Sequence, residues 1–140
     1  MNFLGMFPTS PLLEIATTHR TNAMRALLDA GATVDEADGD GMTPLSWAAL
    51  SSRTEMASLL IRRKADVNHV DHHGMTPLLY AASIDFGDSG MIELLLKSGA
   101  NPQARTKEGL TALDLARQYH HDYLIAALTR KAIPKDGQTR

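Results

Sequence analysis

The sequence contains no cysteine among its 140 residues. Disulfide bonds, thiolate catalysis and zinc sites built on cysteine are therefore excluded. Aromatic residues make up only 5% of the chain, and no apolar run approaches the roughly 20 residues that a transmembrane helix requires. The formal net charge of -2 leaves no broad basic field that would attract nucleic acid. We therefore expect no membrane-spanning segment and no nucleic-acid partner.

The remaining composition is that of a folded protein, with 44% hydrophobic and 21% charged residues. The apolar residues 1–7 lack a charged leader and run into Pro8, so they do not predict a secretory signal. We expect a soluble protein located in the cytoplasm. Residues 132–140 are polar and contain Pro134 and Gly137, which predicts a flexible C-terminal tail.

A short motif recurs along the chain with a nearly constant period. Its copies are Ser10-Pro11-Leu12, Thr43-Pro44-Leu45, Thr76-Pro77-Leu78 and Thr111-Ala112-Leu113, which begin at intervals of 33, 33 and 35 residues. Fixed periods of about 20 to 50 residues are typical of repeat architectures. The pattern predicts a single domain over residues 1–131, built from repeats at about 9–37, 38–70, 71–105 and 106–131.

The second repeat shows the local structure that the residues favour. Thr43 is a good N-cap, and Pro44 suits the first position of a helix, where no amide donor is needed. A second helix is predicted around residues 56–61 and ends in the cations of residues 62–64, which suit the negative end of the helix dipole. Gly74 then permits a tight turn. Helices this short are marginal alone, so the repeats must stack. The expected fold class is all-α with short β-hairpin turns.

Two segments carry a family resemblance. Gly41-Met42-Thr43-Pro44-Leu45 with Ala48-Ala49, and Gly74-Met75-Thr76-Pro77-Leu78 with Ala81-Ala82, resemble the ankyrin repeat. The resemblance implies antiparallel helix pairs with β-hairpin fingers, stacked into a curved solenoid whose first and last repeats act as caps. Ankyrin arrays bind proteins through the fingers and the concave face of the first helices, so the resemblance implies a protein–protein interaction module.

The sequence departs from the family pattern at two places. The family usually has histidine after Thr-Pro-Leu, whereas this chain has Leu13, Ser46, Leu79 and Asp114. Asp114 lies three residues after Thr111, which predicts a capping box in the last repeat. The third repeat has two extra residues within 83–90, which predicts a longer turn. Its Phe86 is either an anchor on the neighbouring repeat or an exposed contact for a partner.

The family's contact positions transfer to a candidate partner-binding set. The set comprises Gly39, Asp40, Met42, Leu50, Ser51, His72, His73, Met75, Ser83, Ile84, Phe86, Lys107, Glu108, Leu110, Gln118 and Tyr119. The fingers differ in charge along the array. The first carries Asp35, Glu36, Asp38 and Asp40, the second His69, Asp71, His72 and His73, and the third Arg105, Lys107 and Glu108. We expect a partner with the opposite order of charges and a pH-dependent affinity between about pH 5 and 8. The alternative is that these tips are merely solvated.

Patterns that would indicate catalysis or metal binding are incomplete. His69, His72, His73, His120 and His121 do not form a His-Glu-x-x-His motif, and adjacent histidines point in different directions. Residues 36–41 resemble half of a calcium loop, but Trp47 stands where the bidentate carboxylate is required. The acidic finger is thus interpreted as surface charge, and Trp47 is predicted to pack between helices. Since no nucleophile elbow is present either, we expect no catalytic residue, no cofactor, no metal and no enzymatic activity.

Other functions stay open at this point. The chain could be a structural or regulatory segment of a larger protein, with its groove occupied intramolecularly. We expect a monomer, but the apolar residues 1–7 suggest a homodimer as an alternative. A metal-dependent enzyme is the most remote reading. The sequence does not identify the partner.

Overall fold

The computed structural model describes residues 11–84 and 89–132, and the side chains up to residue 129. Eight helices occur within these ranges. They are α1 (Pro11–Ile15), α2 (Thr21–Asp29), α3 (Pro44–Leu50), α4 (Thr54–Arg62), α5 (Pro77–Ser83), α6 (Gly90–Lys97), α7 (Ala112–Gln118) and α8 (Asp122–Ala132). Phe86 and the apolar residues 1–7 lie outside the described residues.

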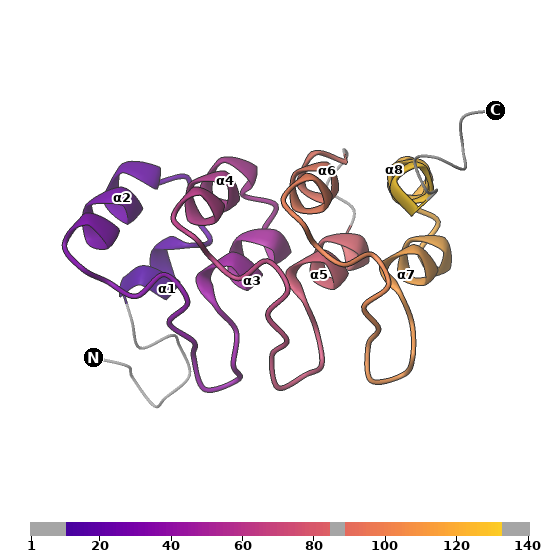
Figure 1. The fold of residues 1–140 in the computed structure, drawn as a ribbon, viewed down its shortest axis with the longest axis horizontal. Coiled ribbons are helices and arrows are strands. Elements are labelled where there is room, and N and C mark those ends of the chain that lie inside the picture. The colour runs from indigo at the N-terminus through magenta and orange to yellow at the C-terminus, as the bar shows by residue number, and fades with distance from the viewer. Residues whose placement is uncertain (1–10, 85–88, 133–140) are drawn as a thin grey trace.

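The helices form two parallel rows. Figure 1 shows α1, α3, α5 and α7 in one row and α2, α4, α6 and α8 in the other. Each first helix packs against the helix that follows it, and helices of the same row pack on their neighbours along the array. Three long loops project beyond the row of first helices (Figure 1). The described part of the chain is therefore a stack of helix pairs, as the repeat period predicts.

Threonine side chains begin three of the first helices. The Thr43, Thr76 and Thr111 hydroxyls accept hydrogen bonds from the amides three residues later, at 3.3, 3.2 and 3.2 Å. At the last helix, the Thr111 amide also donates to the Asp114 carboxylate at 3.0 Å. The predicted capping box is thus confirmed, and two amides at the start of α7 are satisfied reciprocally.

Left-handed residues end several helices. Gly31 and Gly99 follow the second helices of their repeats with φ of 105° and 102°. Lys64 occupies the same register in the second repeat and adopts a φ of 75°. Ser52 and His120 adopt φ of 56° and 60° after α3 and α7. A side chain at such a backbone conformation costs about 1 to 2 kcal/mol, so Lys64, Ser52 and His120 are mildly strained helix ends.

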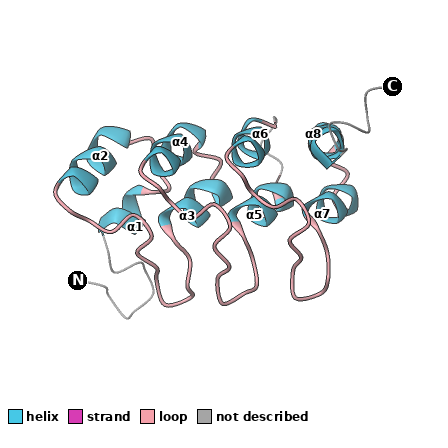
Figure 2. Ribbon diagram, viewed as in Figure 1, coloured by secondary structure: helices cyan, strands magenta, loops and turns pink. Residues whose placement is uncertain are grey.

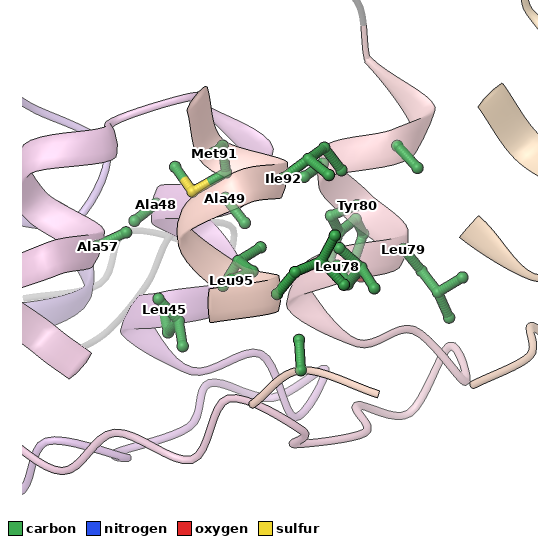
Figure 3. Close-up of a cluster of buried hydrophobic side chains, with 14 of the residues drawn as sticks. Leu45, Ala48, Ala49, Ala57, Leu78, Leu79, Tyr80, Met91, Ile92 and Leu95 are labelled. Atoms are coloured by element: carbon green, nitrogen blue, oxygen red, sulfur yellow. The ribbon is translucent and has the colours of Figure 1, made fainter. Parts of the chain in front are cut away.

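The hydrophobic core runs through the whole stack. Leu45 and Leu78, 33 residues apart, are both almost fully buried, and so are Leu60 and Leu95 on the second helices. Figure 3 shows buried side chains of the second and third helix pairs, among them Leu45, Ala49, Leu78 and Leu95, within one cluster. The alanines allow close approach between successive first helices, and the leucines fill the space between the two rows.

Polar bonds also join successive helix pairs. Arg53, at the start of α4, donates through Nε to the Thr17 carbonyl of the first pair at 2.7 Å. His121 lies in the same register before α8, is buried, and contacts the Ala82 carbonyl through Nδ1 at 3.3 Å. The two carbonyls lie just after α1 and in the last turn of α5, so each contact satisfies a carbonyl near the C-terminal end of the first helix of the preceding pair. No helix within the described ranges is long and apolar enough to cross a membrane.

Candidate partner-binding surface

The projecting loops contain three similar tips, which we call finger 1 (residues 37–42), finger 2 (residues 70–75) and finger 3 (residues 105–110). In each tip a backbone hydrogen bond joins the second residue to the last: Asp38 N to Met42 O at 3.0 Å, Asp71 N to Met75 O at 3.0 Å, and Thr106 N to Leu110 O at 2.8 Å. Their glycines, Gly41, Gly74 and Gly109, have φ between 78° and 87° at the turn. The expected hairpins are thus present as loops, and the described ranges contain no strand (Figure 2).

An acceptor at the base of each finger organises its backbone. Asp38 Oδ1 accepts from the Asp40 and Met42 amides at 2.9 and 3.0 Å. Asp71 repeats this pattern with the His73 and Met75 amides at 2.9 and 3.0 Å. In finger 3 the acceptor is the neutral Thr106 hydroxyl, which is 3.2 Å from the amides of residues 108 and 110. Asp38 is half-buried, so the interpretation of residues 36–41 as surface charge was wrong for this carboxylate, and its counterpart Asp71 is buried.

The second oxygen of each carboxylate bonds to an aromatic residue on the following first helix. Asp38 Oδ2 accepts from the Trp47 indole N–H at 3.0 Å, and Asp71 Oδ2 accepts from the Tyr80 hydroxyl. Trp47 is half-buried against the core, as expected, but its polar bond to a finger was not predicted. Burial raises the pKa of Tyr80 above its usual range, and the hydrogen bond to Asp71 raises it further. Tyr80 therefore stays a neutral donor in ordinary conditions.

Fingers 1 and 2 are bonded directly to each other. The His72 amide donates to the Asp40 carbonyl at 2.9 Å, and His69 Nε2 lies 2.6 Å from the Gly41 carbonyl. His73 Nε2 lies 3.8 Å from Asp40 Oδ1, which is an ion pair when the histidine is protonated. A Cβ at Gly41 would lie 2.8 Å from the His72 ring. The ring therefore packs closely over the preceding finger, where only glycine fits.

The junction between fingers 2 and 3 is made by a lysine. Lys107 Nζ donates to the His72 carbonyl at 2.8 Å, and its aliphatic part lies over Gly74, where a Cβ would be 2.7 Å from Lys107 Cγ. Lys107 thus occupies the same register as His72. Because this link depends on an exposed and flexible side chain, it constrains the junction less than the bonds between fingers 1 and 2 do.

The structure divides the predicted contact residues by exposure. Exposed members are Gly39, Asp40, His72, His73, Lys107, Glu108, Gln118 and Tyr119. Half-buried members are Leu50, Ser51, Met75, Ser83, Ile84 and Leu110. Met42 is only 5% exposed and belongs to the core, so its assignment to the contact surface is corrected. Met42 lies within the cluster of buried core side chains, whereas Met75 and Leu110 at the same register pack against that cluster and stay partly accessible.

One exposed apolar residue was missed by the sequence reasoning. Val70 has 58% of its surface exposed, more than Tyr119 at 49%, and these are the large hydrophobic residues that stand out on the described surface. Val70 lies between the half-buried His69 and the buried Asp71. Ala37 and Arg105 take the same register in fingers 1 and 3, and both are exposed. The sequence signal available for this exposed residue was the position of Val70 between two polar residues, His69 and Asp71, which the structure turns inward.

Histidines in and next to finger 2 are engaged in contacts with finger 1. His69 meets the Gly41 carbonyl and His73 faces Asp40. Within residues 11–84 and 89–132, no group of three or more His, Cys, Asp or Glu residues is arranged to hold a metal ion. His69, His72 and His73 therefore do not form a metal site, although they are close in sequence.

Stacked pairs of short helices with fingers along one side define a solenoid-type helical repeat protein. Comparison with protein families identifies which one. A profile described as ankyrin repeats (3 copies) matches residues 2–71, and a profile described as ankyrin repeats (many copies) matches residues 59–116. The chain belongs to the ankyrin repeat family. No curated protein shows a significant match to the sequence.

Proposed function

We propose that the protein binds another protein through its three fingers and the adjoining row of first helices. Ankyrin repeats are generally protein–protein interaction modules. The observation that carries the proposal is that each finger has one side chain that orders its backbone and another that stays exposed at its tip. The ordering side chains are those of Asp38, Asp71 and Thr106, and the exposed ones are those of Asp40, His73 and Glu108. Ordered loops with exposed side chains are suited to recognition, because little flexibility is lost on binding.

The exposed charges suggest the chemistry of the partner. Glu36 and Asp40 remain exposed near finger 1, whereas Arg105 and Lys107 give finger 3 a positive side, although both also donate to backbone carbonyls. Val70 offers an apolar contact between them. We infer a partner segment with a basic side chain opposite finger 1, an apolar side chain at Val70 and an acidic side chain opposite finger 3.

This role requires no catalytic group. The proposal is thus a binding protein without enzymatic activity, consistent with the non-enzymatic role typical of the family. The cytoplasmic location, the monomeric state and the alternative roles as a segment of a larger protein or as a homodimer stay predictions.

Selection from a phage-displayed random peptide library tests the proposal. Wild-type protein is the bait, and enriched peptides are measured against a Asp40→Ala/Val70→Ser/His73→Ala variant, whose changes all lie at exposed finger positions. A Glu55→Ala/Lys97→Ala variant on the second helices is the matched control. We expect the finger variant to weaken binding at least about tenfold and the control to leave it unchanged. Failure to enrich any peptide, or peptides sensitive only to the control changes, would overturn the proposal.

A further inference from the structure

Fingers 1 and 2 are each attached to a first helix by a single carboxylate. In both, Oδ1 bonds to two amides of the tip, while Oδ2 bonds to an aromatic donor nine residues later, Trp47 or Tyr80. The tip and the helix are thus joined through one side chain. Since Trp47 and Tyr80 both pack against the core, they transmit its rigidity to the fingers.

Finger 3 has the same loop but not the same attachment. Thr106 stands in place of the carboxylate, and its neutral hydroxyl makes the longer 3.2 Å contacts to the tip amides. Leu115, at the register of Trp47 and Tyr80, is buried and carries no donor. Hydrogen bonds to a charged acceptor are roughly twice as strong as neutral ones. Finger 3 is therefore held less firmly to its helix.

The bonds between fingers follow the same division. Fingers 1 and 2 share the His72–Asp40 backbone bond and the contact of His69 with the Gly41 carbonyl. Between fingers 2 and 3 the described contact is that of the Lys107 ammonium with the His72 carbonyl. An ammonium on a flexible stem can move without disturbing either backbone.

We propose that Trp47 and Tyr80 are positioning residues for the partner surface: they hold fingers 1 and 2 as one pre-organised surface, whereas finger 3, held less firmly to its helix, adjusts its position when the partner binds. The inference rests on the proposed function for its binding consequence. Its structural consequence is independent of any partner. The tip amides of finger 2 are protected from hydrogen exchange by a carboxylate that Tyr80 of α5 holds in place, and those of finger 1 by a carboxylate that Trp47 of α3 holds in place.

Amide hydrogen exchange, measured by NMR on the free protein, tests this positioning role. Tyr80→Phe keeps the ring in the core and removes only the hydroxyl. We expect the His73 and Met75 amides to exchange about tenfold faster, while the Asp40 and Met42 amides are unaffected. Trp47→Phe is the reciprocal control and should speed exchange in finger 1 only. Exchange of core helix amides, followed in the same samples, separates a local change from global destabilisation.

A gain variant tests the other half of the proposal. Thr106→Asp introduces the carboxylate that finger 3 lacks, and we expect slower exchange of the Glu108 and Leu110 amides. Unchanged finger 2 amides in Tyr80→Phe, or equal acceleration throughout the chain, would overturn the positioning role. With a selected peptide, Tyr80→Phe should weaken binding about tenfold. If the variants change amide exchange as expected but no peptide binds, the proposed function alone is rejected. If a peptide binds Tyr80→Phe with unaltered affinity, the positioning role alone is rejected.

Discussion

Replacing Leu60 by alanine measures how strongly the stacked core holds the array together. Leu60 is completely buried on α4, which packs against both α2 and α6. The substitution removes the equivalent of three methylene groups, worth about 0.8 kcal/mol each, or roughly 2.4 kcal/mol in transfer free energy. The residual cavity adds to this, so we expect a loss of about 3 to 4 kcal/mol, within the range seen for buried leucines.

Leu27 provides the matched control for this substitution. It lies 33 residues earlier in the same register, on α2, but is only half-buried because one side of the first helix pair has no neighbouring pair among the described residues. Leu27→Ala should therefore cost only about 1 kcal/mol, with little cavity formed. The difference between the two variants reports the stacking contribution of an additional helix pair.

Urea unfolding of both variants gives the free energies directly. Circular dichroism follows the helices, and the fluorescence of Trp47, the single tryptophan, follows the second pair. For unchanged slopes of about 1 to 3 kcal/mol per molar urea, Leu60→Ala should lower the midpoint by at least about 1 M. Equal losses at the two positions, or a loss below about 1 kcal/mol at Leu60, would refute a core built by stacking repeats.

Four further substitutions test packing, pH dependence and backbone strain. Ala81→Leu should cost about 1 to 3 kcal/mol by overpacking the buried face of α5, as measured by urea unfolding. Hydrogen bonds from the backbone and side chain of Thr111 lower the pKa of Asp114. The stabilisation that this carboxylate gives the folded protein is therefore present above about pH 4 and is lost as the pH falls further. Asp114→Asn should reduce the loss of stability at acid pH, and an unchanged loss would contradict this role of Asp114. Because the pKa of Tyr80 is raised, its stabilisation is complete below about pH 10 and is lost above it; Tyr80→Phe should weaken this alkaline decline. Lys64→Gly should increase the free energy of unfolding by up to about 1 kcal/mol and so raise the melting temperature slightly, because relief of the positive φ exceeds the entropy that glycine loses on folding. A lower melting temperature would argue against strain at Lys64.

The sequence predicted the repeating local structure well, because that structure depends on neighbouring residues. Thr43, Thr76 and Thr111 cap their helices as expected, and the capping box formed with Asp114 needs only a spacing of three residues. The period alone determined that the helices occur in stacked pairs. The candidate contact set, which came from the family's positions, stays a prediction.

Contacts between repeats could not be predicted in this way. The acidic pattern of residues 36–41 looked like surface charge, but Asp38 is held by the Trp47 indole nine residues later. His69 looked like a free fingertip, yet it contacts the Gly41 carbonyl 28 residues earlier. Met42 turned out to be buried although Met75, at the same register, is half-exposed. Each outcome depends on which side chain the neighbouring repeat places opposite, and the period of the motif does not specify that.

Chemical-shift mapping with a peptide from the library selection tests the central claim most directly. The peptide is titrated into ¹⁵N-labelled wild-type protein, and the backbone amide shifts are followed. If the fingers are the binding surface, the largest changes will fall on fingers 1 to 3 and on the adjoining ends of α3, α5 and α7. Changes concentrated on α2, α4, α6 and α8, with the fingers undisturbed, would contradict it.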